Sequence, residues 1–135
     1  MARAHASLKT THSPDRVWAL VGGFDNLPQW LPFIVESTLS EGGRLRTLKA
    51  ADGNTIVERM QAFDEQARTC TYSIEQSPFP ISSYLATVRV SADGQGSLVE
   101  WFGEFTPAGI SEDEAHALFQ GVYEGGMQDL AKALG

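Results

Sequence analysis

Apolar and polar residues alternate near the start of the chain, over residues 3–10. Ala4, Ala6 and Leu8 share one parity, and polar side chains occupy most positions between them. A period of two is typical of a strand with one buried face. We therefore expect the chain to begin with a half-buried strand.

A helical segment is expected next. Ser13 offers a side-chain oxygen to a helix N-terminus, and Pro14 follows at the first helical position, where its missing N–H costs nothing. This helix is expected to run to about Gly22-Gly23. Residues 25–32 contain two prolines, which leave room for at most one further helical turn in a connecting segment.

Short clusters of turn-forming residues divide the chain from Phe33 onward into extended stretches. Stretches joined by such short turns predict an antiparallel meander. The six expected strands cover approximately residues 33–40, 44–50, 54–63, 67–76, 81–91 and 97–106.

The C-terminal segment predicts the longest helix, over residues 111–134. Ser111 and Glu114 have the spacing of a capping box, and apolar residues then recur at intervals of three and four. The Gly125-Gly126 pair lowers the helix propensity by roughly 1 to 2 kcal/mol. Either close packing on the sheet or room for a ligand would explain this pair.

This order of elements predicts an α+β fold. A curved seven-stranded antiparallel sheet is expected to wrap around the long C-terminal helix, with two short helices between the first two strands. Such a sheet encloses more volume than one helix fills. The remaining space must hold aromatic side chains, which make up 10% of the chain, or a ligand pocket.

Strand alternation places Glu58 toward the interior. It shares its parity with Ile56, Met60 and Ala62, the more apolar set, whereas Arg59 points outward. Burial would raise the pKa of the Glu58 carboxyl unless a cation or hydroxyl pairs with it. Such a carboxyl could move protons on a bound carbonyl compound; the alternative is a structural carboxylate bonded to a neighbouring Tyr or Arg.

Two tyrosines, Tyr72 and Tyr84, are expected on inward faces of their strands. Each phenol must find a partner in this apolar space or lose a hydrogen bond worth about 1 kcal/mol. Either hydroxyl could orient a ligand oxygen or share proton transfer with Glu58. Ordinary packing, with the hydroxyl bonded to backbone or water, is the alternative for each tyrosine.

Further large apolar residues are expected to face the same interior. They are candidates for the lining of a pocket, although a plain core needs the same residue types. The predicted ligand-binding residues are Trp30, Phe33, Met60, Trp101, Phe105, Phe119, Tyr123 and Met127.

Composition and charge narrow the possible partners. The 135 residues carry a formal net charge of −7, so nucleic acid and anionic membranes are not expected partners. No stretch approaches the ~18 apolar residues of a membrane span, so stable membrane insertion is not expected. No signal peptide is visible, and a cytoplasmic location is expected.

The chain offers little metal or redox chemistry. Its single cysteine, Cys70, is expected to be a small buried apolar residue without a disulfide partner. The three histidines, His5, His12 and His116, lack the spacing of metal ligands, so no metal site is expected. No nucleotide-binding or nucleophile motif precedes a helix, and no cofactor is expected.

Several short segments, taken in order, resemble the SRPBCC superfamily, and within it the polyketide cyclase/dehydrase-like branch. They are residues 13–18 (SPDRVW), 30–32 (WLP), 58–60 (ERM), 71–74 (TYSI), 78–80 (PFP) and 99–105 (VEWFGEF). The resemblance covers nearly the whole chain. It implies one START-like helix-grip domain over residues 1–135, with a deep cavity for an apolar ligand between the sheet and the terminal helix.

Three functional hypotheses follow. The first is binding of a small hydrophobic or amphipathic ligand, such as a lipid, quinone or polyketide-like molecule. The second is a cyclase or dehydratase in which Glu58 acts with Tyr72 or Tyr84. The third is a protein-interaction module with a filled core, in which Trp101 packs tightly against Phe119 and Tyr123. The sequence leaves a monomer and a homodimer open.

Overall fold

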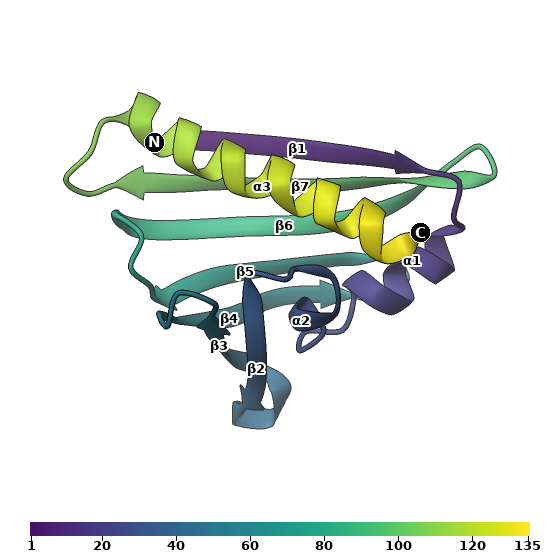
Figure 1. The fold of residues 1–135 in the computed structure, drawn as a ribbon, viewed down its shortest axis with the longest axis horizontal. Helices are drawn as coiled ribbons and strands as arrows, with labels where there is room; N and C mark the ends of the chain where they lie inside the picture. The colour runs from purple at the N-terminus through teal and green to yellow at the C-terminus, as the bar shows by residue number, and fades with distance from the viewer.

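The computed structural model describes residues Met1–Gly135 and confirms the predicted α+β helix-grip fold (Figure 1). One antiparallel sheet contains all seven strands in the order β1-β7-β6-β5-β4-β3-β2. The elements are β1 (Ala2–Thr10), α1 (Pro14–Val21), α2 (Leu27–Trp30), β2 (Ile34–Ser40), η1 (Glu41–Gly43), β3 (Leu45–Ala50), β4 (Thr55–Asp64), β5 (Thr69–Gln76), β6 (Ile81–Asp93), β7 (Gly96–Pro107) and α3 (Glu112–Leu134).

The boundaries differ from the predicted ones by a residue or two, and β5 shows why. It begins at Thr69 instead of residue 67, because the preceding turn is longer than its sequence suggests. The Asp64 carboxylate accepts hydrogen bonds from the N–H groups of Gln66 and Ala67. Arg68 then has a φ of 54°, which belongs to a turn and not to a strand.

β1 lies at one edge of the sheet, where it pairs with β7 along its whole length, from Ala2 opposite Phe105 to Thr10 opposite Ser97. The other five pairings join strands that follow one another in sequence. The sheet is therefore a six-stranded meander whose last strand is joined by the first strand of the chain.

The sheet is strongly curved. In Figure 1, β1, β7 and β6 run horizontally, while β2 stands almost upright at the far edge. Register shifts interrupt the pairing of β4 with β5, one of them between Met60 and Ala62. Such bulges bend a strand and increase its twist. This bulge also turns Ala62 outward, so the prediction that Ala62 shares the buried face of Glu58 is wrong.

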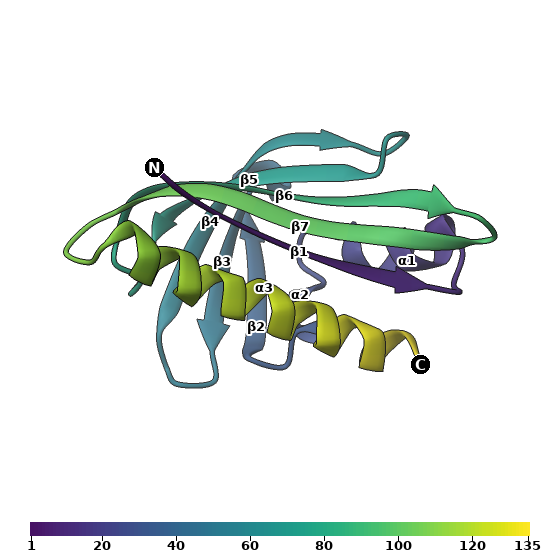
Figure 2. The ribbon, with the colours of Figure 1, turned by 90° about the horizontal axis from the view of Figure 1, so that it is seen from above.

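α3 lies along the concave side of the sheet, as Figure 2 shows from above. Its N-terminus has the predicted capping box between Ser111 and Glu114. Close approach to the sheet requires glycine at two positions. A Cβ on Gly126 would lie 2.5 Å from Trp101, and a Cβ on Gly103 would overlap the Tyr123 hydroxyl. No helix of the structure combines the length and the apolar character that crossing a bilayer demands.

Candidate functional site

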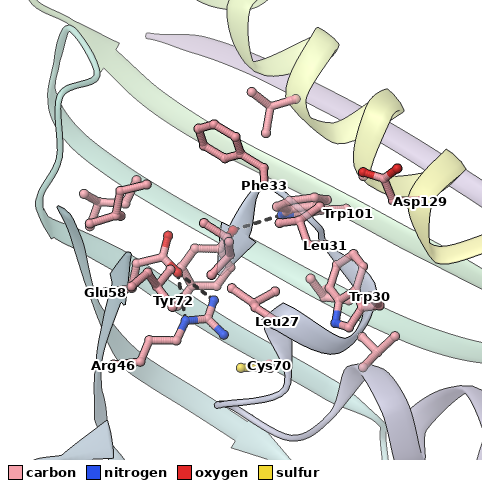
Figure 3. A pocket seen from close by; sticks show the side chains of 18 of the residues that line it. Leu27, Trp30, Leu31, Phe33, Arg46, Glu58, Cys70, Tyr72, Trp101 and Asp129 are labelled. Atoms are coloured by element: carbon pink, nitrogen blue, oxygen red, sulfur yellow. Dashed lines mark hydrogen bonds and ion pairs between the residues drawn. The ribbon is translucent and has the colours of Figure 1, made fainter. Parts of the chain in front are cut away.

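A cavity of about 360 Å³ lies between the concave face of the sheet and α3, closed at one side by α1 and α2 (Figure 3). Hydrophobic residues make up 18 of the 25 that line it, so its walls suit an apolar molecule. The filled core that the interaction-module hypothesis requires is therefore not what the structure shows, although Trp101 does stack on Tyr123 with ring centroids 4.5 Å apart.

The structure brings most of the predicted site residues to this cavity. Those that line it are Trp30, Phe33, Glu58, Tyr72, Tyr84, Trp101 and Phe119. They come from α2 and its following loop, from β4 to β7, and from α3.

Four predicted ligand-binding residues do not line the cavity. Phe105 and Tyr123 are fully buried in the core, where Phe105 packs on Phe119 with ring centroids 4.5 Å apart. Met127 faces the side of α3 that carries β1, next to Ala6. Met60 is half-buried beside the β4 bulge. Alternation and helical periodicity indicated a buried face correctly, but they did not separate the core from the cavity wall.

A buried ion pair forms the polar side of the cavity. Glu58 on β4 lies directly opposite Arg46 on β3. Arg46 Nε and Nη2 lie 2.8 and 2.6 Å from Glu58 Oε1. Arg46 Nη1 also donates to the Phe24 carbonyl oxygen at 2.9 Å, and Arg46 Cζ lies 4.2 Å from the centroid of the Phe24 ring. These contacts satisfy the cation within an apolar surrounding.

Burial raises the pKa of the Glu58 carboxyl, and the attraction and hydrogen bond of Arg46 oppose this rise without cancelling it. Both of these Arg46 contacts go to the same carboxylate oxygen, Oε1. The inward position of Glu58 agrees with its strand parity. Its role in proton transfer stays a prediction.

Sequence reasoning missed Arg46, although a signal was present. Arg46, Leu48 and Ala50 share one parity of β3, and all three are buried. An arginine on the apolar parity of a strand next to Glu58 could have been recognised as the partner of that carboxylate.

A chain of hydrogen bonds runs from the cavity wall into the core. The Trp101 indole N–H donates to the Tyr72 hydroxyl at 3.0 Å, and that hydroxyl lies 3.4 Å from the hydroxyl of Tyr84. Tyr84 is hydrogen-bonded in turn to Tyr123. Burial raises the pKa of all three tyrosines, so each phenol keeps its proton at neutral pH.

The three indole N–H groups of the protein differ in their partners. Trp18 donates to Glu65 at 2.8 Å and Trp101 donates to Tyr72. The N–H of Trp30 is buried and has no hydrogen-bond partner in the protein. Buried polar groups are almost always paired, so this donor in the cavity wall calls for an explanation.

Bare helix surface forms part of the cavity mouth. Gly121 and Gly125 of α3 line the cavity, and a Cβ on either would meet nothing within 4 Å. Half-buried Asp129 lies one turn further along the same face, and Phe33, 46% exposed, stands opposite it (Figure 3). Each of the two explanations for the glycine pair therefore applies to one residue. Gly126 allows close packing on the sheet, and Gly125 leaves open space beside the cavity.

The cavity offers little nucleophilic or metal chemistry. Cys70 is buried in its wall, and burial raises the pKa of the thiol, which keeps it protonated and unreactive. No group of three or more His, Cys, Asp or Glu side chains in the structure could hold a metal ion.

Comparison with known proteins gives consistent matches. The family model described as polyketide cyclase / dehydrase and lipid transport matches residues 1–135. Among solved structures, the protein XoxI from Bacillus cereus is 46% identical, with a TM-score of 0.96 over 99% of this chain and 96% of its own. An uncharacterized protein from Bacillus thuringiensis is 44% identical, with a TM-score of 0.94 over 98% of both chains. Ara h 8.0201, 19% identical over 98% of this chain and 96% of its own, shares the fold at a TM-score of 0.78.

Proposed function

Because the chain belongs to the polyketide cyclase / dehydrase and lipid transport family, we propose that it binds a small hydrophobic or amphipathic molecule in the cavity between the sheet and α3. The observation that carries this proposal is the cavity itself, about 360 Å³ in volume and lined mostly by hydrophobic residues. Burial of roughly 200 Å² of apolar ligand surface would contribute about 5 kcal/mol to binding. The few polar groups in the wall would then fix the orientation of the ligand.

Native mass spectrometry of protein released by mild lysis tests this function. We expect a species heavier than the 14.7 kDa chain, with the added mass released by organic solvent. A Gly125→Leu variant is the matched control, because its side chain would project into the open space at the mouth and reduce the bound fraction. Recovery of the empty chain alone from several hosts, with no uptake of added lipids or aromatic ketones, would contradict the proposal.

A catalytic role is the second candidate, and the position of Glu58 favours it. A carboxyl with a raised pKa lines the cavity together with Tyr72 and Tyr84, which suits proton transfer on a bound carbonyl compound. Against it, the tight pairing of Glu58 with Arg46 is also what a structural carboxylate would show. A turnover that Glu58→Gln abolishes while ligand binding persists would support the enzyme; unchanged turnover would exclude Glu58 from it.

A further inference from the structure

The residues that line the cavity carry polar groups that differ in whether they already have a partner. We propose that the ligand is an uncharged molecule whose apolar body carries carbonyl-type oxygens, and that the Trp30 N–H and the Tyr72 hydroxyl donate hydrogen bonds to them. This inference rests on the proposed function, because it assigns a chemical class of ligand to the same cavity. Its support comes from an unpaired donor, a count of hydroxyl hydrogens and the charges of the wall.

The unpaired donor is the indole of Trp30. The side chain is 3% exposed and lines the cavity, and its N–H meets no protein acceptor. An indole N–H can only donate. Leaving it unpaired in an apolar wall costs free energy, which a ligand oxygen would recover.

The hydrogen count concerns the three linked hydroxyls of Tyr72, Tyr84 and Tyr123. They carry three hydrogens and share two hydrogen bonds, so one hydrogen must point out of the chain. At one end, Tyr123 is fully buried against Gly103 and bonds to Tyr84 alone. At the other end, Tyr72 lines the cavity and already accepts the hydrogen of Trp101.

The favourable direction of this chain follows from those two ends. Tyr123 donates to Tyr84, Tyr84 donates to Tyr72, and the remaining hydrogen lies on Tyr72, where a ligand can reach it. The reverse direction would leave the free hydrogen on Tyr123, enclosed by the core without an acceptor. In the third arrangement Tyr84 accepts from both neighbours, and the free hydrogen lies on Tyr84, which also lines the cavity. The cavity therefore presents a second donor, and both donors seek an acceptor oxygen.

The charges of the wall argue against an anionic ligand. Three charged side chains line the cavity: Arg46, Glu58 and Asp129. Arg46 is already paired with Glu58, and Asp129 adds a carboxylate near the mouth. A ligand carboxylate would find no free cation and would be repelled by Asp129, whereas a ketone, ester or quinone oxygen carries no charge to repel.

Three probes that share one ring system test the inference on the full chain: 2-acetylnaphthalene, 2-ethylnaphthalene and 2-naphthoate. The first two have the same carbon skeleton, and 2-acetylnaphthalene carries a C=O group where 2-ethylnaphthalene has CH₂. Trp30→Phe and Tyr72→Phe should each weaken 2-acetylnaphthalene binding roughly fivefold and change 2-ethylnaphthalene binding less than about twofold. Trp18→Phe is the matched control and should affect neither probe, because its N–H bonds to Glu65 outside the cavity lining.

Nuclear magnetic resonance of the wild-type protein gives a readout that needs no variant. On adding 2-acetylnaphthalene, the indole ¹⁵N–H signal of Trp30 should move to lower field, while 2-ethylnaphthalene should not produce this shift. Equal sensitivity of both probes to Trp30→Phe and Tyr72→Phe would overturn the inference and leave ligand binding intact. Tighter binding of 2-naphthoate than of the ketone would also overturn it. Binding of none of the three would contradict the proposed function, and the inference with it.

Discussion

Arg46 and Glu58 face each other across β3 and β4, and both side chains are less than 10% exposed. Removing two charges from water costs several kcal/mol, which their attraction and hydrogen bonds recover only in part. Removal of one partner alone leaves an uncompensated buried charge and is far more damaging than replacement of both. The pair therefore gives the cavity wall a polar group, and its net contribution to the stability of the fold is small.

The pKa of Glu58 makes a pH-dependent prediction. It is raised above the usual 4.5, so the folded protein holds this proton more strongly than the unfolded chain does. The stabilising contribution of Glu58 is then fully present below about pH 4.5 and is lost as pH rises through the raised pKa. Urea unfolding from pH 4 to 8 should show that the free-energy advantage of the wild type over Glu58→Gln shrinks as pH rises, by up to about 1.4 kcal/mol per pH unit within this window.

Glu75 supplies a control of opposite sign. The hydrogen bond from Arg59 lowers the pKa of this exposed carboxyl, so its contribution is lost as pH falls and not as pH rises. The advantage of the wild type over Glu75→Gln should therefore grow with pH. Growth of the Glu58 difference with pH would show that attraction to Arg46 outweighs burial, contrary to the prediction.

For single residues, the sequence predicts which face of a strand a side chain occupies better than it predicts the residue with which that side chain pairs. The inward position of Glu58 follows from the apolar residues at the same parity of β4. The pairing with Arg46 depends on the register between β3 and β4, which alternation within one strand does not contain. The unpaired N–H of Trp30 is still harder to predict from the sequence, because it depends on which acceptors the folded chain places around it.

Among the elements, α3 shows how one helix serves both core and cavity. Tyr123, Met127 and Leu130 bury one side of it, while Gly121 and Gly125 leave the cavity side bare. Such glycines weaken the helix by about 1 kcal/mol each relative to alanine. The glycines stand where a side chain would project into the cavity or collide with the sheet.

The adjacent glycines of α3 predict opposite effects for the same substitution. Gly125→Ala should stabilise the protein by about 1 kcal/mol, because its Cβ meets nothing within 4 Å and the helix gains propensity. Gly126→Ala should destabilise it by roughly 1 to 3 kcal/mol, because its Cβ would lie 2.5 Å from the Trp101 ring. That ring cannot move freely, since it stacks on Tyr123 and bonds to Tyr72.

Chemical denaturation of the two single variants measures both effects, and each serves as the control for the other. Equal effects of the two substitutions would show that helix propensity alone governs this segment. The Gly125→Ala methyl group should also narrow the mouth and slow ligand release, which stopped-flow displacement of a bound probe would detect.

The elements themselves were largely predictable because turn chemistry is local. The two-residue connection at Gly94-Gln95, with a φ of 60° at the glycine, is a hairpin signal that needs no tertiary information. The position of a β-bulge, by contrast, does not follow from the residues of the bulge alone. The extra residue beside Ala62 is set by how β4 must bend against β5, and nothing in the sequence of β4 marks it.

For the whole molecule, the decisive property is that the curved sheet is only partly filled. The sequence predicted a surplus of enclosed volume from the number of strands against a single helix, and the structure contains the cavity. The helix-grip fold and the family resemblance are both confirmed. The division of aromatic residues between core and cavity wall was not predictable, because Phe105 and Phe119 both lie on the buried face of their element, yet only Phe119 lines the cavity.

An incompletely filled interior predicts a large response to a ligand. A molecule that binds only the folded state at 100 times its dissociation constant stabilises a protein by about 2.7 kcal/mol. For a chain of this size we expect a rise in the thermal midpoint of about 10 °C with 2-acetylnaphthalene. Scanning calorimetry at several probe concentrations checks this, and Gly125→Leu should show a smaller rise. A midpoint independent of probe concentration would contradict the presence of an accessible cavity.

The pairing of β1 with β7 also affects when this fold can form during synthesis. β1 leaves the ribosome before its partner β7 at Gly96–Pro107, so it stays unpaired while the residues between the two strands are being made. Contacts of such large sequence separation slow folding, and an unpaired strand edge invites association with other chains. Residues of α3 form part of the cavity wall, so the cavity can close only after α3 has been translated.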